Sequence, residues 1–369
     1  MNRNKMMLIL LLGLVVSLIV VSCKKEASLA PSTPPGGKDP RTYTWTVDTL
    51  QYPGSFQTAM MRIWGSSPTD VYVVGHNDVG SGKMYHYNGQ RWQVVRITQA
   101  EGGPILRPDL TDINGSGAQD IFAVGVREYE NPNPPPFALD SSLVIHYDGS
   151  RWSEIPTVGS FLNAIAVGRT GFAYAAGMGT IGFAIRGQSV LRDSVAIPLP
   201  DSATFQINTV AVGPNNEVYA NGNYYLPDQP TLDFLFLKRG NDNRWTIIDS
   251  ARLGFPLPEA RWGDARLWYS PWGTLYSTGR GVFTWDEARW SRVYDASASL
   301  TGIDGNKPDN LFVVGYPGQI LHFNGRDWYR FAQFSGTGLV MDDVIDFEDE
   351  VFAIGTDGGG NRTFVLHGK

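Results

Sequence analysis

The sequence predicts an all-β fold built from many short strands. The 369 residues include 42 Gly, 23 Pro, 11 Trp, 16 Tyr and 18 Phe, a composition typical of strands joined by tight turns. No long stretch after residue 42 shows the 3.6-residue period of an amphipathic helix. A four-strand pattern also recurs along the chain. These three observations together define the expected fold class.

Each copy of the repeat contains four expected strands. The first strand and a polar turn lead to a second strand ending in Gly, and a third strand and a short turn lead to a fourth strand that opens with Trp. The Gly recurs seven times, at Gly75, Gly125, Gly177, Gly222, Gly279, Gly315 and Gly355. The Trp recurs at Trp92, Trp152, Trp245, Trp290 and Trp328, whereas the third copy has Val190 near the matching place.

Four strands in each ~40–45 residues are the signature of a propeller blade. One such sheet cannot bury both of its faces, so neighbouring copies must stack. Residues 42–369 are therefore predicted to form a seven-bladed β-propeller of four-stranded antiparallel blades. A ring of six or eight blades is the alternative if degenerate copies are miscounted. A β-sandwich is disfavoured, because seven in-phase copies have no role there.

The last blade is expected to take strands from both ends of this region. The seventh copy reaches Lys369 before any fourth strand, and residues 43–47 (YTWTV) match the Trp-bearing strand of the other copies. Pairing these two segments closes the ring and removes an exposed sheet edge.

Short turns join the third and fourth strands. Asn88-Gly89, Asp148-Gly149 and Asn324-Gly325 predict type I′ hairpins, which need positive φ at both central residues. The Trp three residues after each Gly is expected to pack between adjacent sheets.

The Gly-x-x-Trp turn resembles the Asp-box type of propeller repeat found in sialidase-like and photosystem-assembly-factor-like proteins. The resemblance covers most of residues 43–369. Tyr87, Tyr147 and Phe323 stand where the Asp-box aspartate, two residues before the Gly, would be. The resemblance implies the propeller fold and carries no activity with it.

The N-terminus predicts a targeting segment. Arg3 and Lys5 precede the apolar run Met6–Val21, and Ser22-Cys23 follows. The segment resembles a bacterial lipoprotein signal peptide with its lipobox. That resemblance implies removal of residues 1–22 and acylation (palmitate) of Cys23. An uncleaved membrane anchor is the alternative, although about 16 residues fall short of the ~20 that a spanning helix needs.

Residues 23–41 then predict the lipidated Cys and a flexible tether, because they are polar and rich in Pro, Gly and Ser. The expected location is the bacterial cell envelope. The membrane is contacted through the lipid at the outer membrane, with the propeller facing either the periplasm or the cell surface.

The net charge and the cysteine content exclude nucleic acid as a partner, an internal disulfide and a Cys/His metal site. The net charge is −6, and residues 1–22 carry two positive charges and no negative one, so the remaining chain carries −8. An acidic chain offers no electrostatic footprint for nucleic acid. Cys23 is the single cysteine, so no internal disulfide and no Cys/His metal site is expected. We predict no metal and no cofactor.

Four of the five histidines recur at one place on the third strand. His86, His146, His322 and His367 are therefore predicted to pack or hydrogen-bond within the blades. His76 follows Gly75 and has no counterpart. It is either a solvated loop residue or part of a site.

Two groups of acidic residues invite a chemical interpretation. Residues 112–115 (DING) and 304–306 (DGN) resemble fragments of calcium loops, but such loops need more oxygen ligands, so both are predicted to be turns between first and second strands. Residues 342–350 hold six acids and are predicted to be a solvated loop and strand edge. The alternative is a cation site or a carboxylate pair for glycoside cleavage.

The long loops fall on one face of the predicted ring. They join second to third strands and one blade to the next, and they are rich in aromatic and Arg residues, which are typical of recognition surfaces. The candidate ligand-binding residues on this long-loop face are His76, Arg127, Tyr129, Phe137, Tyr224, Tyr225, Arg261, Trp262, Arg280 and Tyr316. The alternative is that these loops merely cap the channel and pack on one another.

The sequence therefore predicts a non-enzymatic, envelope-anchored lipoprotein whose monomeric propeller binds a protein or a glycan on the long-loop face. A polysaccharide-acting propeller enzyme, a hydrolase or a lyase, is the alternative. No catalytic residue is assigned.

Overall fold

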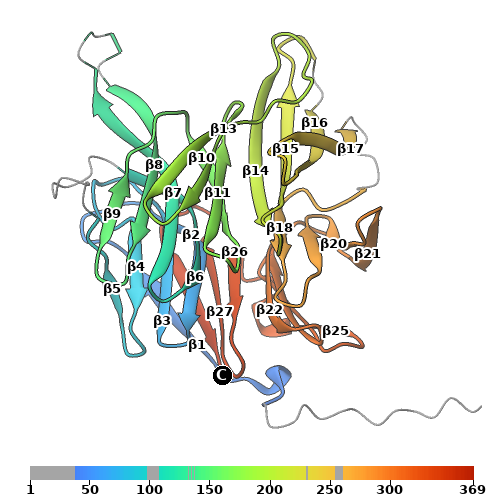
Figure 1. The fold of residues 1–369 in the computed structure, drawn as a ribbon. Helices are drawn as coiled ribbons and strands as arrows, with labels where there is room; N and C mark the ends of the chain where they lie inside the picture. The colour runs from blue at the N-terminus through green and yellow to red at the C-terminus, as the bar shows by residue number, and fades with distance from the viewer. Residues whose placement is uncertain are drawn as a thin grey trace, which may run out of the picture. The chain divides into compact units, whose positions relative to one another are not determined.

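The computed structural model describes residues 38–97, 108–131, 133, 135–136, 138–229, 232–253 and 261–369. Lys38–Lys369 form one compact unit. Its described residues form seven four-stranded antiparallel sheets (Figure 1). The first strand of each sheet contacts the first strands of both neighbouring sheets, so the sheets close a ring. This confirms the predicted seven-bladed propeller. Cys23 and residues 1–37 lie outside the described part.

The first four blades follow one another along the chain. Blade 1 contains β2 (Thr58–Ser67), β3 (Asp70–Asn77), β4 (Met84–Tyr87) and β5 (Trp92–Val94). Blade 2 contains β6 (Pro108–Gly117), β7 (Asp120–Glu130), β8 (Ala138–Tyr147) and β9 (Trp152–Ile155). Blade 3 contains β10 (Leu162–Val167), β11 (Phe172–Gly177), β12 (Ile181–Arg186) and β13 (Ser189–Ser194). Blade 4 contains β14 (Thr204–Val212), β15 (Val218–Tyr225), β16 (Leu232–Arg239) and β17 (Trp245–Leu253).

Three further blades complete the ring. Blade 5 contains β18 (Arg266–Tyr269), β19 (Leu275–Thr278), β20 (Gly281–Trp285) and β21 (Trp290–Asp295). Blade 6 contains β22 (Leu300–Lys307), β23 (Asn310–Gly315), β24 (Gln319–Phe323) and β25 (Trp328–Arg330). Blade 7 contains β26 (Val340–Asp346), β27 (Val351–Thr356), β28 (Thr363–Gly368) and β1 (Trp45–Leu50). Two short 3₁₀ helices are η1 (Pro40–Thr42) and η2 (Ala332–Phe334).

The ring closes as the sequence predicts. β1 is the outer strand of blade 7 and pairs antiparallel with β28, from Trp45 opposite Gly368 to Leu50 opposite Thr363. The C-terminus accordingly lies beside β1 (Figure 1). Leu50 is buried, and Trp45 makes edge contacts with Phe331 and Phe334 in the segment that joins blades 6 and 7.

The repeated Trp residues lie between blades, as expected from their large apolar area. Four of the five contact an aromatic ring of the preceding blade, whereas Trp92 packs on the cluster between blades 1 and 7. The pairs and their centroid distances are Tyr72–Trp152 at 5.6 Å, Tyr174–Trp245 at 5.6 Å, Phe236–Trp290 at 4.9 Å and Tyr294–Trp328 at 4.9 Å.

The four repeated histidines are confirmed as blade-building residues. The Nε2 atom of each histidine lies within hydrogen-bond distance of a polar residue at or just before the start of the second strand. The imidazole ring also packs against the aromatic side chain two residues after that polar residue. The polar pairs are His86–Asp70 at 2.7 Å, His146–Asp120 at 2.8 Å, His322–Asn310 at 2.8 Å and His367–Glu350 at 2.6 Å. Burial lowers the pKa of His322 to about 4.

The predicted type I′ turns are wrong. Gly89, Gly149 and Gly325 have φ of +86°, +90° and +83°, whereas the Asn or Asp before each of them does not have positive φ. The Asn88 side chain instead accepts hydrogen bonds from the backbone N–H groups of Gln90 and Arg91, both at 3.1 Å. A side chain that bonds its own turn removes the need for a second left-handed residue.

Candidate functional site

Several acidic residues that the sequence placed in turns or solvent lie on the innermost strands. Asp112 is on β6 and Asp304 on β22, so the predicted turns at 112–115 and 304–306 are wrong. Asp343 and Asp346 are on β26 and are 4 % and 7 % exposed, which contradicts a solvated loop. The turn prediction failed because these strands run three residues or more beyond the acids.

Some of these side chains join one blade to the next. The backbone N–H of Ile165 donates to Asp112 Oδ2 at 3.0 Å, and that of Ile63 donates to Asp343 Oδ2 at 3.3 Å. Asp304 Oδ2 accepts from the N–H of Asp346 at 2.8 Å. The inner edge of a first strand has no strand partner of its own, so these bonds satisfy groups that would otherwise be orphaned.

One ion pair crosses the central channel. Arg266 of blade 5 donates to both oxygens of Asp112 of blade 2, at 3.2 and 3.1 Å, and Asp112 is 1 % exposed. Arg62 Nε lies 3.8 Å from Asp112 Oδ1. Burial lowers the pKa of Arg266, but Asp112 and Asp343 raise it further than burial lowers it. Burial raises the pKa of Asp343, and Arg266 and Arg62 oppose that rise.

A cavity of about 440 Å³ adjoins this ion pair. Most of its lining comes from the later halves of the first strands and from the residues that follow them, so it lies toward the face that carries the tight turns. We call it the channel cavity. Trp64, Trp268 and Phe347 supply its large aromatic groups, while Arg266, Asp304, Asp343 and Asp346 supply its charged groups.

Two glycines let the aromatic groups lie close to the next blade. A Cβ added at Gly115 would meet the Trp64 ring at 2.7 Å, and one at Gly65 would meet Phe347 at 3.0 Å. Both contacts are closer than a real Cβ normally makes, so a larger residue at either position would have to displace the neighbouring ring.

Asp304 and Asp346 have unusual electrostatics. Burial raises the pKa of Asp304 to about 7, backbone N–H donors oppose the rise, and Asp343 adds to it. Burial and the charge of Asp304 raise the pKa of Asp346 well above its ordinary value. Asp346 Oδ2 accepts from the backbone N–H of Asn306 at 3.1 Å and from Asn310 Nδ2 at 2.8 Å. Its Oδ1 is buried and has no hydrogen-bond partner among the described residues.

On the predicted long-loop face, several candidate residues are already paired. His76 Nδ1 and Lys83 Nζ each lie 2.8 Å from Asp109 Oδ1. Arg127 donates to Glu154 at 3.2 Å. The structure therefore brings His76 together with two charged neighbours that sequence analysis did not name.

The remaining candidates are spread over several blades. Trp262 is buried, at 4 % exposed, in the cluster between blades 4 and 5, so it is a packing residue. Arg261 is exposed and pairs with Asp249 at 2.9 Å. Tyr225 and Tyr316 are 48 % and 51 % exposed. The last of the candidates with described side chains are half-buried Tyr224 and exposed Arg280. The side chain of Tyr129, and Phe137 as a whole, lie outside the described residues.

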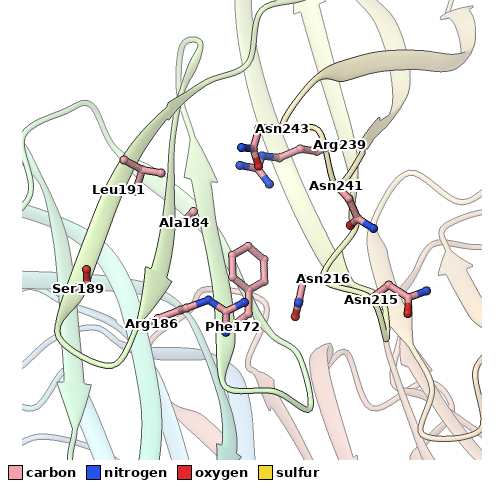
Figure 2. Close-up of a pocket in the computed structure, with 10 residues that line it drawn as sticks. All are labelled: Phe172, Ala184, Arg186, Ser189, Leu191, Asn215, Asn216, Arg239, Asn241 and Asn243. Carbon is pink, nitrogen blue, oxygen red and sulfur yellow. The ribbon is translucent and has the colours of Figure 1, made fainter.

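A second cavity, of about 430 Å³, lies between blades 3 and 4 (Figure 2). Arg186 lies over the Phe172 ring at 5.2 Å, and Arg239 donates to Asp193 at 2.7 Å. The rest of its polar lining is mostly amide, from Asn215, Asn216, Asn241 and Asn243. Because Arg239 already has a carboxylate partner, this cavity presents mainly neutral hydrogen-bonding groups.

The described residues provide neither a metal-binding cluster nor a membrane-spanning helix. No group of three or more His, Cys, Asp or Glu in this part of the chain could hold a metal ion. None of its helices has both the length and the apolar character required to cross a membrane.

The comparisons with known proteins define the fold class. No family model and no curated protein matches the chain. A solved structure of YCF48 bound to D1 peptide is 14 % identical, with a TM-score of 0.55, and the match covers 89 % of this chain and 97 % of that one. The WD40 β-propeller domain of Doa1 is 8 % identical, with a TM-score of 0.53 and coverage of 88 % and 97 %.

A third solved propeller is similar to the same extent. The β-propeller domain of Myceliophteria thermophila Cps50 (Swd1) is 10 % identical, with a TM-score of 0.53, and the match covers 87 % of this chain and 99 % of that one. At such low identity these similarities support the propeller fold and carry no function with them.

The channel cavity was missed by sequence analysis, although two signals pointed to it. Trp64 and Trp268 occupy the same repeat position as Asp304, one residue after the aliphatic core residue of the first strand. The densest acidic stretch of the chain, at 342–350, begins on another first strand.

Proposed function

We propose that this protein is a recognition module that binds a protein partner at the channel cavity. The observation that carries the proposal is the cavity's lining. A concave space of about 440 Å³, with aromatic groups and a few convergent polar groups, is the usual form of a ligand site. Support also comes from the similar propeller YCF48, which was solved with a peptide bound.

We further propose that Cys23 carries the lipid and that the propeller works in the bacterial cell envelope. The N-terminal pattern described above supports this anchor. Radioactive palmitate should label the wild-type chain expressed in bacteria and should not label the Cys23→Ser variant. Equal labelling of both chains would contradict lipidation at this residue.

The binding proposal can be tested by selecting peptides against the full-length protein in detergent. A random 12-residue display library should yield peptides that bind saturably. Ser66 is exposed at the cavity and bonds Asp70 at 2.5 Å, so Ser66→Trp should obstruct the cavity and weaken binding at least about tenfold.

Ser116 offers a matched control for this substitution. It occupies the equivalent place in blade 2, bonds Asp120 at 2.6 Å and is not part of the cavity lining. Ser116→Trp should leave peptide binding unchanged. Absence of any enriched peptide contradicts protein binding, and equal behaviour of the two Trp variants contradicts the channel cavity as the site.

One observation favours an enzyme as the second candidate. Asp304 and Asp346 line one cavity, and burial raises the pKa of both, so a protonated carboxyl of the kind that glycoside cleavage uses as its general acid is present near neutral pH. Release of reducing ends from a polysaccharide panel, lost in the Asp304→Asn/Asp346→Asn variant, would establish this activity. A glycan array run in parallel tests glycan binding without cleavage.

A further inference from the structure

Asp346 combines deep burial with an unused hydrogen-bond acceptor. Its side chain is 7 % exposed, and it lines the channel cavity. Oδ2 is fixed by Asn306 and Asn310, whereas Oδ1 has no partner among the described residues. A buried carboxylate oxygen without a donor costs free energy unless a proton or a ligand supplies one.

The cavity also has an excess of negative groups. Asp304, Asp343 and Asp346 line it together with one guanidinium, that of Arg266. Arg266 already donates two hydrogen bonds to Asp112. Lys307 acts weakly on Asp346, but it is 48 % exposed and lies 3.4 Å from Glu348. Among the described residues, no cation therefore donates to the unpartnered oxygen of Asp346.

The aromatic groups favour a particular kind of cation. Trp64, Trp268 and Phe347 line the same cavity, and aromatic faces attract cations, with Trp the strongest. A hard metal ion needs several oxygen ligands, and the described residues provide no such group. A guanidinium is planar, weakly hydrated and able to donate to two acceptors at once, so it suits aromatic and carboxylate neighbours together.

We propose that the channel cavity takes the guanidinium of an arginine side chain from the protein partner, donating to Asp346 Oδ1 and lying against the aromatic groups. This inference rests on the proposed protein-binding function and names the partner chemistry of that same site. The guanidinium would supply both the missing donor and the missing positive charge.

The first test uses small probes on the wild-type, full-length protein. N-acetyl-arginine methylamide should bind saturably by calorimetry or saturation-transfer NMR, with a Kd on the order of 1 mM for so small a ligand. N-acetyl-citrulline methylamide has nearly the same shape and no charge, and it should bind at least about tenfold more weakly. Equal binding of the citrulline or the lysine analogue would overturn the guanidinium assignment.

The second test isolates Asp346. In Asp346→Asn the amide oxygen can still accept from Asn306 and Asn310, while the amide nitrogen replaces Oδ1. Arginine binding should fall at least about tenfold, with the thermal unfolding midpoint used to verify folding. Asp349→Asn is the matched control, because Asp349 is exposed and lies outside the cavity lining. Unchanged binding in a folded Asp346→Asn variant overturns the proposal.

The two proposals fail in different ways. If selected peptides bind but tolerate replacement of every arginine by citrulline, protein binding stands and the arginine site falls. If the arginine probe binds through Asp346 but no peptide is ever enriched, the cation site stands and protein binding falls. Should Asp346→Asn not fold, the arginine–citrulline comparison on the wild-type chain decides the arginine site alone.

Discussion

The long-loop face and the channel cavity differ in how their charged groups are partnered. On the long-loop face, His76 and Lys83 meet Asp109, Arg127 meets Glu154, and Arg261 meets Asp249. In the channel cavity, carboxylates outnumber cations, and one oxygen of Asp346 has no partner among the described residues. These charged groups of the long-loop face therefore have partners within the protein, whereas the cavity has a hydrogen-bond acceptor without one among the described residues.

The difference shows that the length of a loop does not determine whether its charged groups are available to a ligand. Long aromatic loops indicate where a surface has room to vary, but their charges can pair locally because flexible side chains reach one another. First strands are held at fixed positions around the ring, so their carboxylates cannot move to find partners. Four experiments test this contrast, in decreasing order of expected effect.

Removal of residues 42–48 should have the largest effect, because it deletes most of the strand that closes blade 7. Asp346 meets Asp304 across the junction between blades 7 and 6. Loss of β1 should abolish cooperative thermal unfolding and expand the protein in size-exclusion chromatography. Thr46→Ala, at an exposed position of the same strand, is the control. A deletion variant as compact and stable as the wild type contradicts the closed ring.

Arg266→Met should be the most destabilising single substitution of the four experiments. It leaves Asp112, which is 1 % exposed, without its main counter-ion. The free energy of unfolding should fall by about 3–5 kcal/mol in urea titration. Adding Asp112→Asn removes the orphaned charge and should recover part of the loss. A loss below about 1 kcal/mol in the single variant would show that the ion pair does not span the channel.

Asp304 should make stability depend on pH. Its folded pKa of about 7 lies above the ordinary value of 3.8, so the folded state keeps a proton that the unfolded state releases. This contribution to stability is complete below about pH 4 and is lost as the pH rises to about 7. The charged neighbours are Asp343, Asp346 and Arg266.

The measurement compares the wild type with Asp304→Asn between pH 4 and pH 8. The stability of the wild type relative to the variant should fall by about 1–3 kcal/mol across this range. Asp70 is a useful contrast, because hydrogen bonds from His86 and Ser66 outweigh its burial and lower its pKa. Between pH 4 and pH 8, the free energy of unfolding of the wild type should not fall relative to that of the Asp70→Asn variant. A flat Asp304 profile would mean that the carboxyl is ionised throughout.

Arg261→Gln should have the smallest effect. Arg261 is 59 % exposed, and its partner Asp249 is 23 % exposed. Exposed ion pairs contribute little, so the free energy of unfolding should change by less than about 1 kcal/mol. The same urea titration as for Arg266→Met makes the comparison direct. A loss comparable with that of Arg266→Met would erase the distinction between the two regions.

Much of the fold could be predicted because its signals are local and repeated. The seven glycines fixed the number of blades, and residues 43–47 identified the closing strand. The turn geometry could not be predicted from Asn-Gly alone, because the Asn88 side chain competes with a second left-handed residue. Of the candidate site, the long-loop face was predicted as a surface, but Trp262 proved to be a buried packing residue.

By itself the sequence determined the all-β class, the count of repeats, the structural role of four histidines and the means of ring closure, because each depends on residues close in the chain or on a recurring pattern. Only the tertiary structure decided what the acids do. Asp112 and Arg266 are 154 residues apart and meet across the channel, and Asp304 and Asp346 meet across a blade junction. The charge of a carboxylate depends on the solvent and partners that surround it, and the ring alone brings these groups together.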